Sequence, residues 1–209
     1  MRYMSTYFIA GIGTDVGKTI ASSIVVEALE ADYWKPIQAG DLHYSDTDKV
    51  KALISNSKSR FFDNAYGLKT PMSPHAAAEI DEILIDSEKI LQPSTDRPLV
   101  IEGAGGLLVP INEQQTICDI IKPEYKILLV SRHYLGSINH TLLSISELKN
   151  RGFKVAGLIW SGDEVPTTES IITSMTDVPV IGRINEEEKF DPTVIRHYAS
   201  KFKQQILSV

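Results

Sequence analysis

Short apolar runs alternate along the chain with segments in which apolar side chains recur at helical spacing. The runs at 99–101 and 127–130 are apolar throughout, which is typical of parallel strands covered on both faces. The pattern predicts strands at residues 6–10, 33–37, 99–102, 127–131, 155–160 and 178–182. It predicts helices at residues 18–30, 46–54, 137–150 and 191–207.

Local signals agree with the ends of these helices. Gly152 lies just beyond the helix at 137–150 as a stop signal, and Pro192 is placed to open the last helix. The alternation of strands and helices predicts an α/β fold, a mostly parallel twisted sheet with helices on both faces, in one domain over residues 1–209. The binding site of such a sheet lies beyond the carboxyl ends of its strands.

Composition narrows the function classes. The 209 residues carry a formal net charge of −6, which argues against binding to nucleic acid or to an anionic membrane. No apolar run approaches the ~18 residues that span a bilayer, and residues 1–6 lack the apolar region of a signal peptide. Cys118 is the single cysteine, and its apolar neighbours predict a buried thiol. These features predict a cytoplasmic protein.

A phosphate-binding loop is the strongest motif. Residues 11–19 read GIGTDVGKT between a predicted strand and a predicted helix, so backbone N–H groups and the helix dipole would face an anion. Lys18 would reach the β- and γ-phosphates, and the Thr19 hydroxyl would bind magnesium. The motif predicts a P-loop NTPase-like fold that binds a nucleoside triphosphate through Gly13, Thr14, Asp15, Val16, Gly17, Lys18 and Thr19.

The loop departs from the usual spacing. Gly11 lies six residues before Gly17, and Ile12 occupies the position where the common pattern has glycine, so the loop is one residue longer. A glycine-rich turn with a chance Gly-Lys-Thr is the alternative interpretation. Asp15 is unusual beside a triphosphate: it either faces a cation, magnesium or a substrate amine, or lies on the solvent-exposed rim.

Two carboxylates are candidates for the metal. Glu102 ends a predicted strand and opens the glycine-rich segment 102–106, where the backbone can pass close to a ligand. Magnesium prefers one or two carboxylates with phosphate oxygens and water. A structural ion pair is the alternative for Glu102. Asp46 heads a helix, where it serves equally well as a cap, and Asp48 competes with it for a ligand role.

Two further motifs have both a structural and a functional interpretation. Lys35 and Pro36 end the second predicted strand, where a lysine would lie beside the phosphate loop and favour developing negative charge. A solvated strand end is the alternative. Ser73, Pro74 and His75 indicate a transition from loop to helix, and His75 is more typical of a structural residue.

Together these motifs resemble the dethiobiotin synthetase family. That family has a phosphate loop lengthened in the same way, and it continues with Lys-Pro, Ser-Asp, Ser-Pro-His, Glu-Gly-Ala-Gly-Gly and Leu-Gly-x-Ile-Asn-His. This chain has the same motifs in the same order at residues 35–36, 45–46, 73–75, 102–106 and 135–140.

The resemblance implies a homodimer that uses ATP and magnesium to convert 7,8-diaminopelargonic acid and carbon dioxide into dethiobiotin. It implies that Thr19, Asp46 and Glu102 hold magnesium, and that Lys18 and Lys35 act on phosphate and on the substrate carbamate. It implies that Ser161 and Glu102 contact the nucleotide. The diamine substrate would contact Lys35, Ala39 and Gly105, together with Gly136, Ser137, Ile138 and Asn139 of the neighbouring subunit.

The chain departs from the family at three positions. Ala39 replaces a hydroxyl residue, Ser161 stands where an asparagine often meets adenine, and Asn185 stands where proline is common. The preference for a nucleotide base therefore stays open.

Three rivals remain. Glutaminase-linked synthetases carry an extra domain for which 209 residues leave no room, and nucleotide-switch ATPases have a second lysine in the loop before the one that matches Lys18. A pure nucleotide-binding module would not need Lys35 together with the segment at 135–140.

Overall fold

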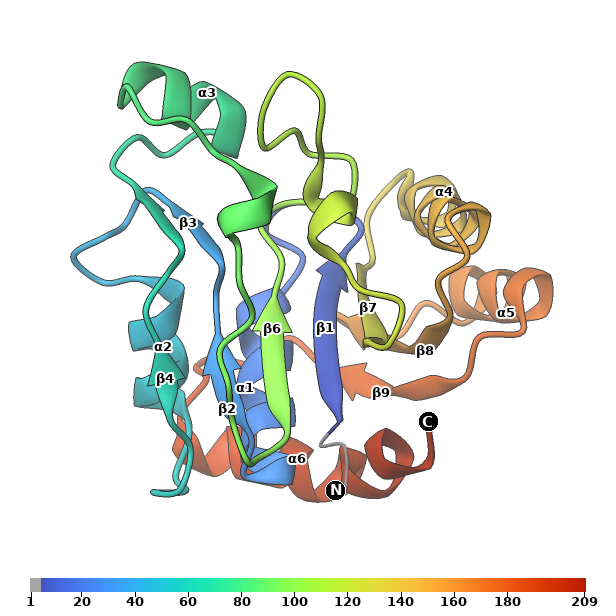
Figure 1. Cartoon of the computed structure of the whole chain (residues 1–209). Coiled ribbons are helices and arrows are strands. Elements are labelled where there is room, and N and C mark those ends of the chain that lie inside the picture. Colours follow the sequence, from blue (N-terminus) through green and yellow to red (C-terminus); the bar gives the residue numbers. More distant parts are fainter. Residues whose placement is uncertain (1–4) are drawn as a thin grey trace.

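The computed structural model describes residues 5–209 and contains a seven-stranded sheet in the order β4-β2-β6-β1-β7-β8-β9, in which every pair is parallel (Figure 1). Its strands are β1 (Thr6–Gly11), β2 (Asp32–Trp34), β4 (Phe61–Phe62), β6 (Leu99–Glu102), β7 (Lys126–Arg132), β8 (Val155–Ser161) and β9 (Val180–Ile184). A second, two-stranded parallel sheet pairs β3 (Ile37–Ala39) with β5 (Tyr66–Leu68). The prediction about a signal peptide falls partly on residues 1–4, outside the described residues.

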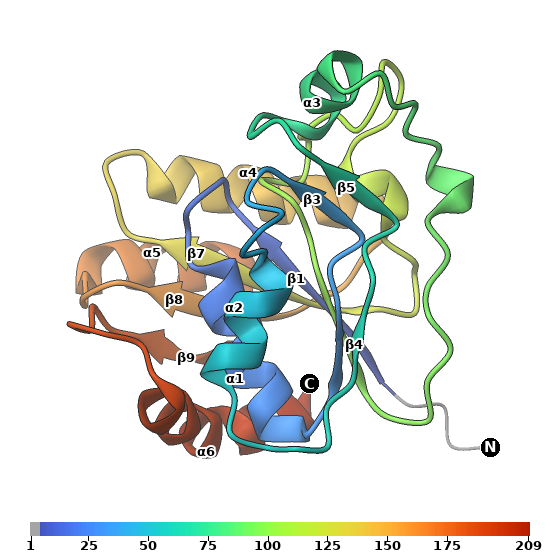
Figure 2. The same ribbon diagram turned by 90° about the vertical axis from the view of Figure 1, so that its left-hand side faces the viewer.

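Helices cover both faces of the large sheet, as the alternating pattern predicted. They are α1 (Lys18–Leu29), α2 (Asp46–Leu53), α3 (Pro74–Ile80), α4 (Ser137–Asn150), α5 (Pro166–Thr176) and α6 (Pro192–Ser208), with short 3₁₀ helices at Ser87–Lys89 and Ile117–Ile120. In Figure 1, β9 lies between α5 above and α6 below. Figure 2 shows α1 packed beside α2, with α6 beneath them. No helix within residues 5–209 is long and apolar enough to cross a bilayer.

The predicted strand at 33–37 is wrong as a single element. β2 ends at Trp34, and β3 begins at Ile37 in the other sheet. Pro36 has no N–H group to donate to a ladder, so the chain leaves the large sheet there. The Pro36 carbonyl instead accepts a hydrogen bond from the Tyr66 N–H at 3.0 Å. This break is what turns Lys35 away from the sheet and toward its carboxyl edge.

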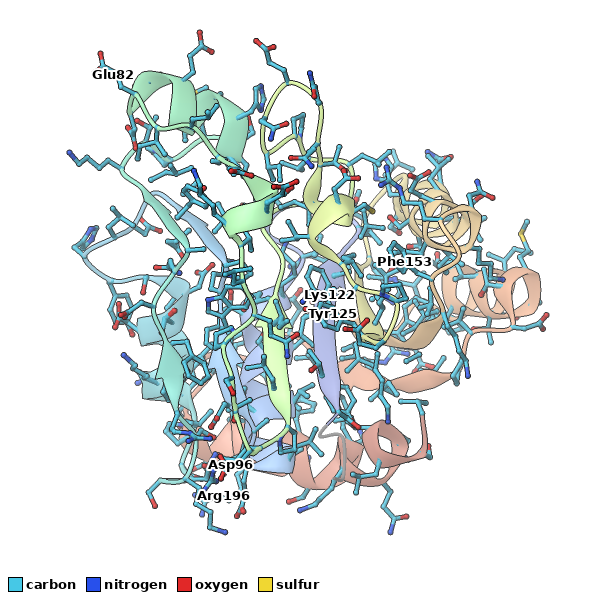
Figure 3. All side chains as sticks on the ribbon, in the orientation of Figure 1. Glu82, Asp96, Lys122, Tyr125, Phe153 and Arg196 are labelled. Atoms are coloured by element: carbon cyan, nitrogen blue, oxygen red, sulfur yellow. The ribbon has the colours of Figure 1, made fainter. Side chains whose placement is uncertain are left out.

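The core lies around the central strand. All six residues of β1 are buried, and Phe8 is completely so. Tyr125, labelled in front of β1 in Figure 3, stacks on Phe8 with ring centroids 6.4 Å apart. Cys118 is also buried, as predicted, and burial raises the pKa of its thiol to about 11. An uncharged thiol of this kind contributes packing and is a poor nucleophile.

Two neighbouring strands deliver the candidate site. β1 and β6 pair in parallel, with Ile9 opposite Glu102. Their arrowheads both point upward in Figure 1, and the phosphate loop and the glycine-rich segment follow them. The two motifs therefore leave the same edge of the sheet, which is the edge where α/β proteins bind ligands.

Candidate functional site

The phosphate loop has the backbone geometry of an anion cradle. Gly17 caps α1 with a φ of 94°, in the left-handed region that favours glycine. A Cβ atom there would lie 2.9 Å from Ser161 Oγ on β8. Lys18 Nζ donates a hydrogen bond to the Gly13 carbonyl at 2.7 Å, so the side chain folds back over the loop. The helix N-terminus and the lysine together provide the positive end of the site.

A cavity of about 710 Å³ opens beside this loop. Most of the residues that the sequence singled out contribute to its wall: Thr14, Asp15, Gly17, Lys18, Thr19, Lys35, Ala39, Asp46, Glu102 and Gly105. The other predicted residues do not line it: Gly13, Val16, Ser161, Gly136, Ser137, Ile138 and Asn139. The structure thus brings together the phosphate loop, both carboxylates and Lys35 in one hollow.

Lys35 lies between the two predicted metal ligands. Its Nζ atom donates to Asp46 Oδ2 at 2.6 Å and to Glu102 Oε1 at 2.8 Å. Thr19 Oγ1 donates to the same Glu102 oxygen at 2.9 Å, and the Tyr33 hydroxyl donates to Glu102 Oε2 at 2.9 Å. Glu102 therefore forms the ion pair of the structural interpretation and also lines the cavity, and its role as a metal ligand stays a prediction.

Burial and charge shape the protonation of this cluster. Burial alone would lower the pKa of Lys35, but the Glu102 and Asp46 carboxylates raise it above its ordinary value. Burial opposes the charge of Asp46, yet Lys35 and Lys49 lower the pKa of its carboxyl group. Burial and, next, the nearby Lys35 lower the pKa of Lys18 to about 8. Lys35 is thus held as a cation, whereas Lys18 titrates near neutral pH.

The structure separates Asp46 from Asp48. Ser45 caps α2 and forms a reciprocal capping box with Asp48, whose carboxylate accepts from the Ser45 N–H at 2.9 Å. Asp46 is not the cap, and its carboxylate is left to face Lys35 and Lys49. At the start of α2, Asp48 therefore caps the backbone and Asp46 faces the cavity.

Asp15 and His75 lie at the margins. Asp15 is exposed on the cavity wall with a φ of 55°, and whether it faces a cation stays open. Ser73 and Pro74 line the cavity at the start of α3, but His75 does not. His75 bonds to its neighbour Ser73 instead, in agreement with the structural interpretation.

Several wall residues were missed by the sequence interpretation, among them Lys49, Gln38 and Arg132. Lys49 binds Asp46 Oδ1 at 3.0 Å, and its spacing of three residues on a helix could have indicated the pair. Gln38 is buried, and its Oε1 accepts from the Asp46 N–H at 3.3 Å. Arg132 lines the cavity as the last residue of β7, a position that the general rule for α/β sheets favours.

The donor set suits magnesium. No group of three or more His, Cys, Asp or Glu side chains within residues 5–209 is arranged to hold a metal by itself. The Thr19 hydroxyl contacts Glu102, and Lys35 Nζ joins Glu102 to Asp46, so the three groups line one part of the cavity. They are oxygen donors of the kind that magnesium combines with phosphate oxygens and water.

Solved structures share the whole architecture. A chain of the MinC:MinD cell division protein complex of Aquifex aeolicus matches with a TM-score of 0.62 at 15% identity, over 98% of this chain and 96% of that chain. The septum site-determining protein MinD of Pyrococcus horikoshii, complexed with Mg-ADP, matches with a TM-score of 0.57 at 13% identity, over 94% and 95%. The fold and the glycine-rich loop define a P-loop NTPase.

Sequence relatives are much more similar. A profile of the AAA domain family matches residues 5–194. The ATP-dependent dethiobiotin synthetase of Christiangramia forsetii is 59% identical over 98% of this chain and 99% of that protein. The corresponding enzyme of Cytophaga hutchinsonii is 43% identical over 95% and 97%. The chain belongs to the ATP-dependent dethiobiotin synthetase family, and it is an ATP-dependent cyclo-ligase.

Proposed function

We propose that this cavity converts 7,8-diaminopelargonic acid, carbon dioxide and ATP into dethiobiotin, ADP and phosphate. The observation that carries the assignment is the position of Lys35, a buried cation placed between the phosphate loop and two carboxylates. A protein that only bound nucleotide would have no need of a second ammonium group at this place. The membership of the synthetase family supports the same reaction.

The proposed chemistry has three steps. One substrate amine captures carbon dioxide and loses a proton, which forms a carbamate. A carbamate oxygen attacks the γ-phosphate of ATP, and the bond to the bridging oxygen breaks to release ADP. The second amine attacks the carbonyl carbon of this carbamic-phosphoric anhydride, loses a proton and expels phosphate as the ring closes. The protein contributes mainly by positioning these groups and by stabilising charge.

Each wall residue has a role in that scheme. Lys18 binds the β- and γ-phosphates, and Lys35 stabilises the carbamate because the neighbouring carboxylates keep it charged. Thr19, Asp46 and Glu102 would hold magnesium, which would neutralise charge on the triphosphate. Thr14, Asp15, Gly17 and Glu102 line the cavity and would face the nucleotide, with Gly13 and Val16 shaping the loop. Ala39 and Gly105 also line it and would face the diamine substrate.

We propose further that the substrate carboxylate binds at the start of α4 in a second copy of the chain. Gly136 to Asn139 do not reach the cavity of their own chain. Leu135 is fully exposed there, and Leu108, Tyr134 and Leu143 are also exposed. Exposed apolar side chains gathered around a helix N-terminus support a homodimer in which each copy completes the other's site.

Product formation is the first test. Phosphate release should require diaminopelargonic acid with bicarbonate, and dethiobiotin should appear by mass spectrometry in equal amount. Hydrolysis stimulated instead by a partner protein or by glutamine would favour the rival classes. A panel of nucleoside triphosphates, run in the same assay, would determine the base preference that Ser161 and Asn185 leave open.

Mixed dimers test the shared site. Lys35→Ala damages the cavity of its own chain, and Asn139→Asp places a negative charge where the partner's substrate carboxylate would bind. Asp is favourable in the first turn of a helix, so Asn139→Asp should not weaken α4. Each variant alone should be inactive, and mixing them should restore activity because one site in each mixed dimer is intact. Mixtures that stay inactive would place the carboxylate site elsewhere.

The assignment of residues 1–209 to one domain stays a prediction. It is supported by the buried apolar residues from β1 to α6, which form a single core cluster. The cytoplasmic location likewise stays a prediction from the sequence.

A further inference from the structure

The cations of the cavity are not equally available to a ligand. Four cationic side chains line the wall: Lys18, Lys35, Lys49 and Arg132. Lys35 forms ion pairs with Asp46 and Glu102, and Lys49 forms one with Asp46. Both carboxylates line the same cavity as the two lysines. Lys18 donates to a backbone carbonyl. Arg132 pairs with Glu186 at 2.6 Å, and Glu186 does not line the cavity.

Strand geometry directs Arg132 toward the phosphate loop. Its neighbour Ser131 points to the opposite face, where its hydroxyl lies 2.8 Å from Thr141 Oγ1 on α4. Arg132 is opposite Ser161 in the pairing of β7 with β8. The Ser161 hydroxyl in turn lies against Gly17 at the start of α1. Arg132 therefore lies on the cavity wall on the β7 side of the N-terminus of α1.

The order of the strands separates Arg132 from the reaction centre. Lys35 follows β2 and Glu102 ends β6, and both strands lie on one side of β1. Arg132 ends β7 on the other side. Under the proposed function the γ-phosphate lies toward Lys35. A triphosphate that lies across the N-terminus of α1 then has its α-phosphate toward β7. Of the four cationic side chains in the cavity wall, Arg132 is the one that β7 contributes.

We propose that Arg132 binds the α-phosphate of the nucleotide, and that Glu186 holds its guanidinium only while the site is free of nucleotide. The pair is suited to exchange because its two side chains are 40% and 53% exposed, so little free energy is lost when it opens. A guanidinium binds phosphate through a planar fork of N–H donors. The inference rests on the proposed function, since it uses the direction of the bound triphosphate.

Nucleotide affinity tests the inference in the full-length enzyme. Arg132→Met should weaken ADP binding by about tenfold, the low end for a charge-assisted hydrogen bond. The KM for ATP should rise by a similar factor while kcat stays unchanged, because the α-phosphate takes no part in the reaction. Inorganic tripolyphosphate, competed against a fluorescent ADP analogue, should lose the same factor, and adenosine should lose none.

Glu186→Gln is the matched control. If Arg132 serves the nucleotide, freeing it from Glu186 should leave ADP binding equal or tighter. If the ion pair only holds the β9 loop in place, both variants should weaken binding alike, and the inference is wrong. It is also wrong if Arg132→Met loses ATP affinity but keeps tripolyphosphate affinity. Wild-type enzyme that makes no dethiobiotin would contradict the proposed function instead, so the two failures are distinguishable.

Discussion

Lys35 Nζ lies 2.8 Å from Glu102 Oε1, and both side chains are almost completely buried. Lys35 directly follows β2 and Glu102 is the last residue of β6, and these neighbouring strands bring the two side chains together. A buried ion pair contributes little net stability, but removing one partner leaves the other charge uncompensated. The pair therefore makes the stability of the apo protein depend on a residue that we assign to catalysis.

Lys35→Met should separate these two contributions. We expect product formation to fall by about 10²–10³-fold, as when a preorganised charge is removed from an active site. The free energy of unfolding should fall by about 3–5 kcal/mol, because Glu102 and Asp46 lose their shared cation. Thermal unfolding with and without magnesium checks the cause, since magnesium should raise the Tm of the variant more than that of the wild type.

Lys49→Met is the control for this variant. Lys49 also pairs with Asp46, but its side chain is 36% exposed. Its removal should change stability by about 1 kcal/mol or less. If the free energy of unfolding fell equally in the two variants, the burial of Lys35 would not explain the effect of removing it.

Tyr33→Phe should loosen Glu102 without removing a charge. The Tyr33 hydroxyl is buried and donates to Glu102 Oε2 at 2.9 Å. Burial and the adjacent Glu102 charge raise its pKa well above the ordinary value, so it donates at every working pH. We expect a loss of about 1–3 kcal/mol in the free energy of unfolding, together with weaker magnesium activation in a titration of initial rate.

Tyr125→Phe provides the comparison for Tyr33→Phe. The Tyr125 hydroxyl donates to Gln92 Oε1 at 2.7 Å, and neither residue lines the cavity. Stability should fall, but the magnesium dependence of the rate should match the wild type. If both variants shift the magnesium dependence, the hydrogen bond from Tyr33 does not specifically orient Glu102 for the metal.

Gly17→Ala should remove nucleotide binding. The substitution would strain a φ of 94° and bring a Cβ to 2.9 Å from Ser161 Oγ, so the loop would have to move. Gly152→Ala is matched in backbone strain, with a φ of 79°, but nothing lies within 4 Å of its Cβ. Calorimetry should find ADP binding lost in the first variant and retained in the second, with a stability cost of about 1–2 kcal/mol in each.

The local motifs could be predicted because each is contained in a few consecutive residues. Strand, glycine-rich loop and helix follow one another around Lys18, and Glu102 ends an apolar strand. The ion pair of Lys35 with Glu102 could not be predicted, since it depends on β2 lying next to β6 and on the break at Pro36. Helix α5 was missed because it is rich in threonine and serine and buries only Ile172 and Thr176.

Fold likeness alone does not assign the function. The solved structures that match include MinD and ParA-family proteins at 15% identity or less, and a likeness at that level shows the fold only. The nucleotide-switch class has a second lysine early in the loop, whereas Ile12 and Gly13 stand there in this chain. The functional distinction therefore lies in a few loop residues and in Lys35, on a sheet that both classes share.

The pKa of Lys18 predicts how nucleotide binding depends on pH. Burial first, and then the charge of Lys35, lower this pKa to about 8, so the free enzyme loses the proton near that pH. Phosphate oxygens favour the charged form, which means that binding above pH 8 takes up a proton. Affinity for ADP should therefore weaken progressively above pH 8.

The lowered pKa of Lys18 also makes the stability of the folded protein depend on pH. The lysine in the unfolded chain keeps its ordinary pKa of 10.5, so between about 8 and 10.5 the unfolded state binds more protons than the folded state. Lys18 therefore makes the free energy of unfolding rise with pH across that window. Lys18→Met should abolish this rise, and it should abolish the proton uptake measured by calorimetry in buffers of different ionisation enthalpy. Proton uptake that persists in Lys18→Met would assign the titration to another group.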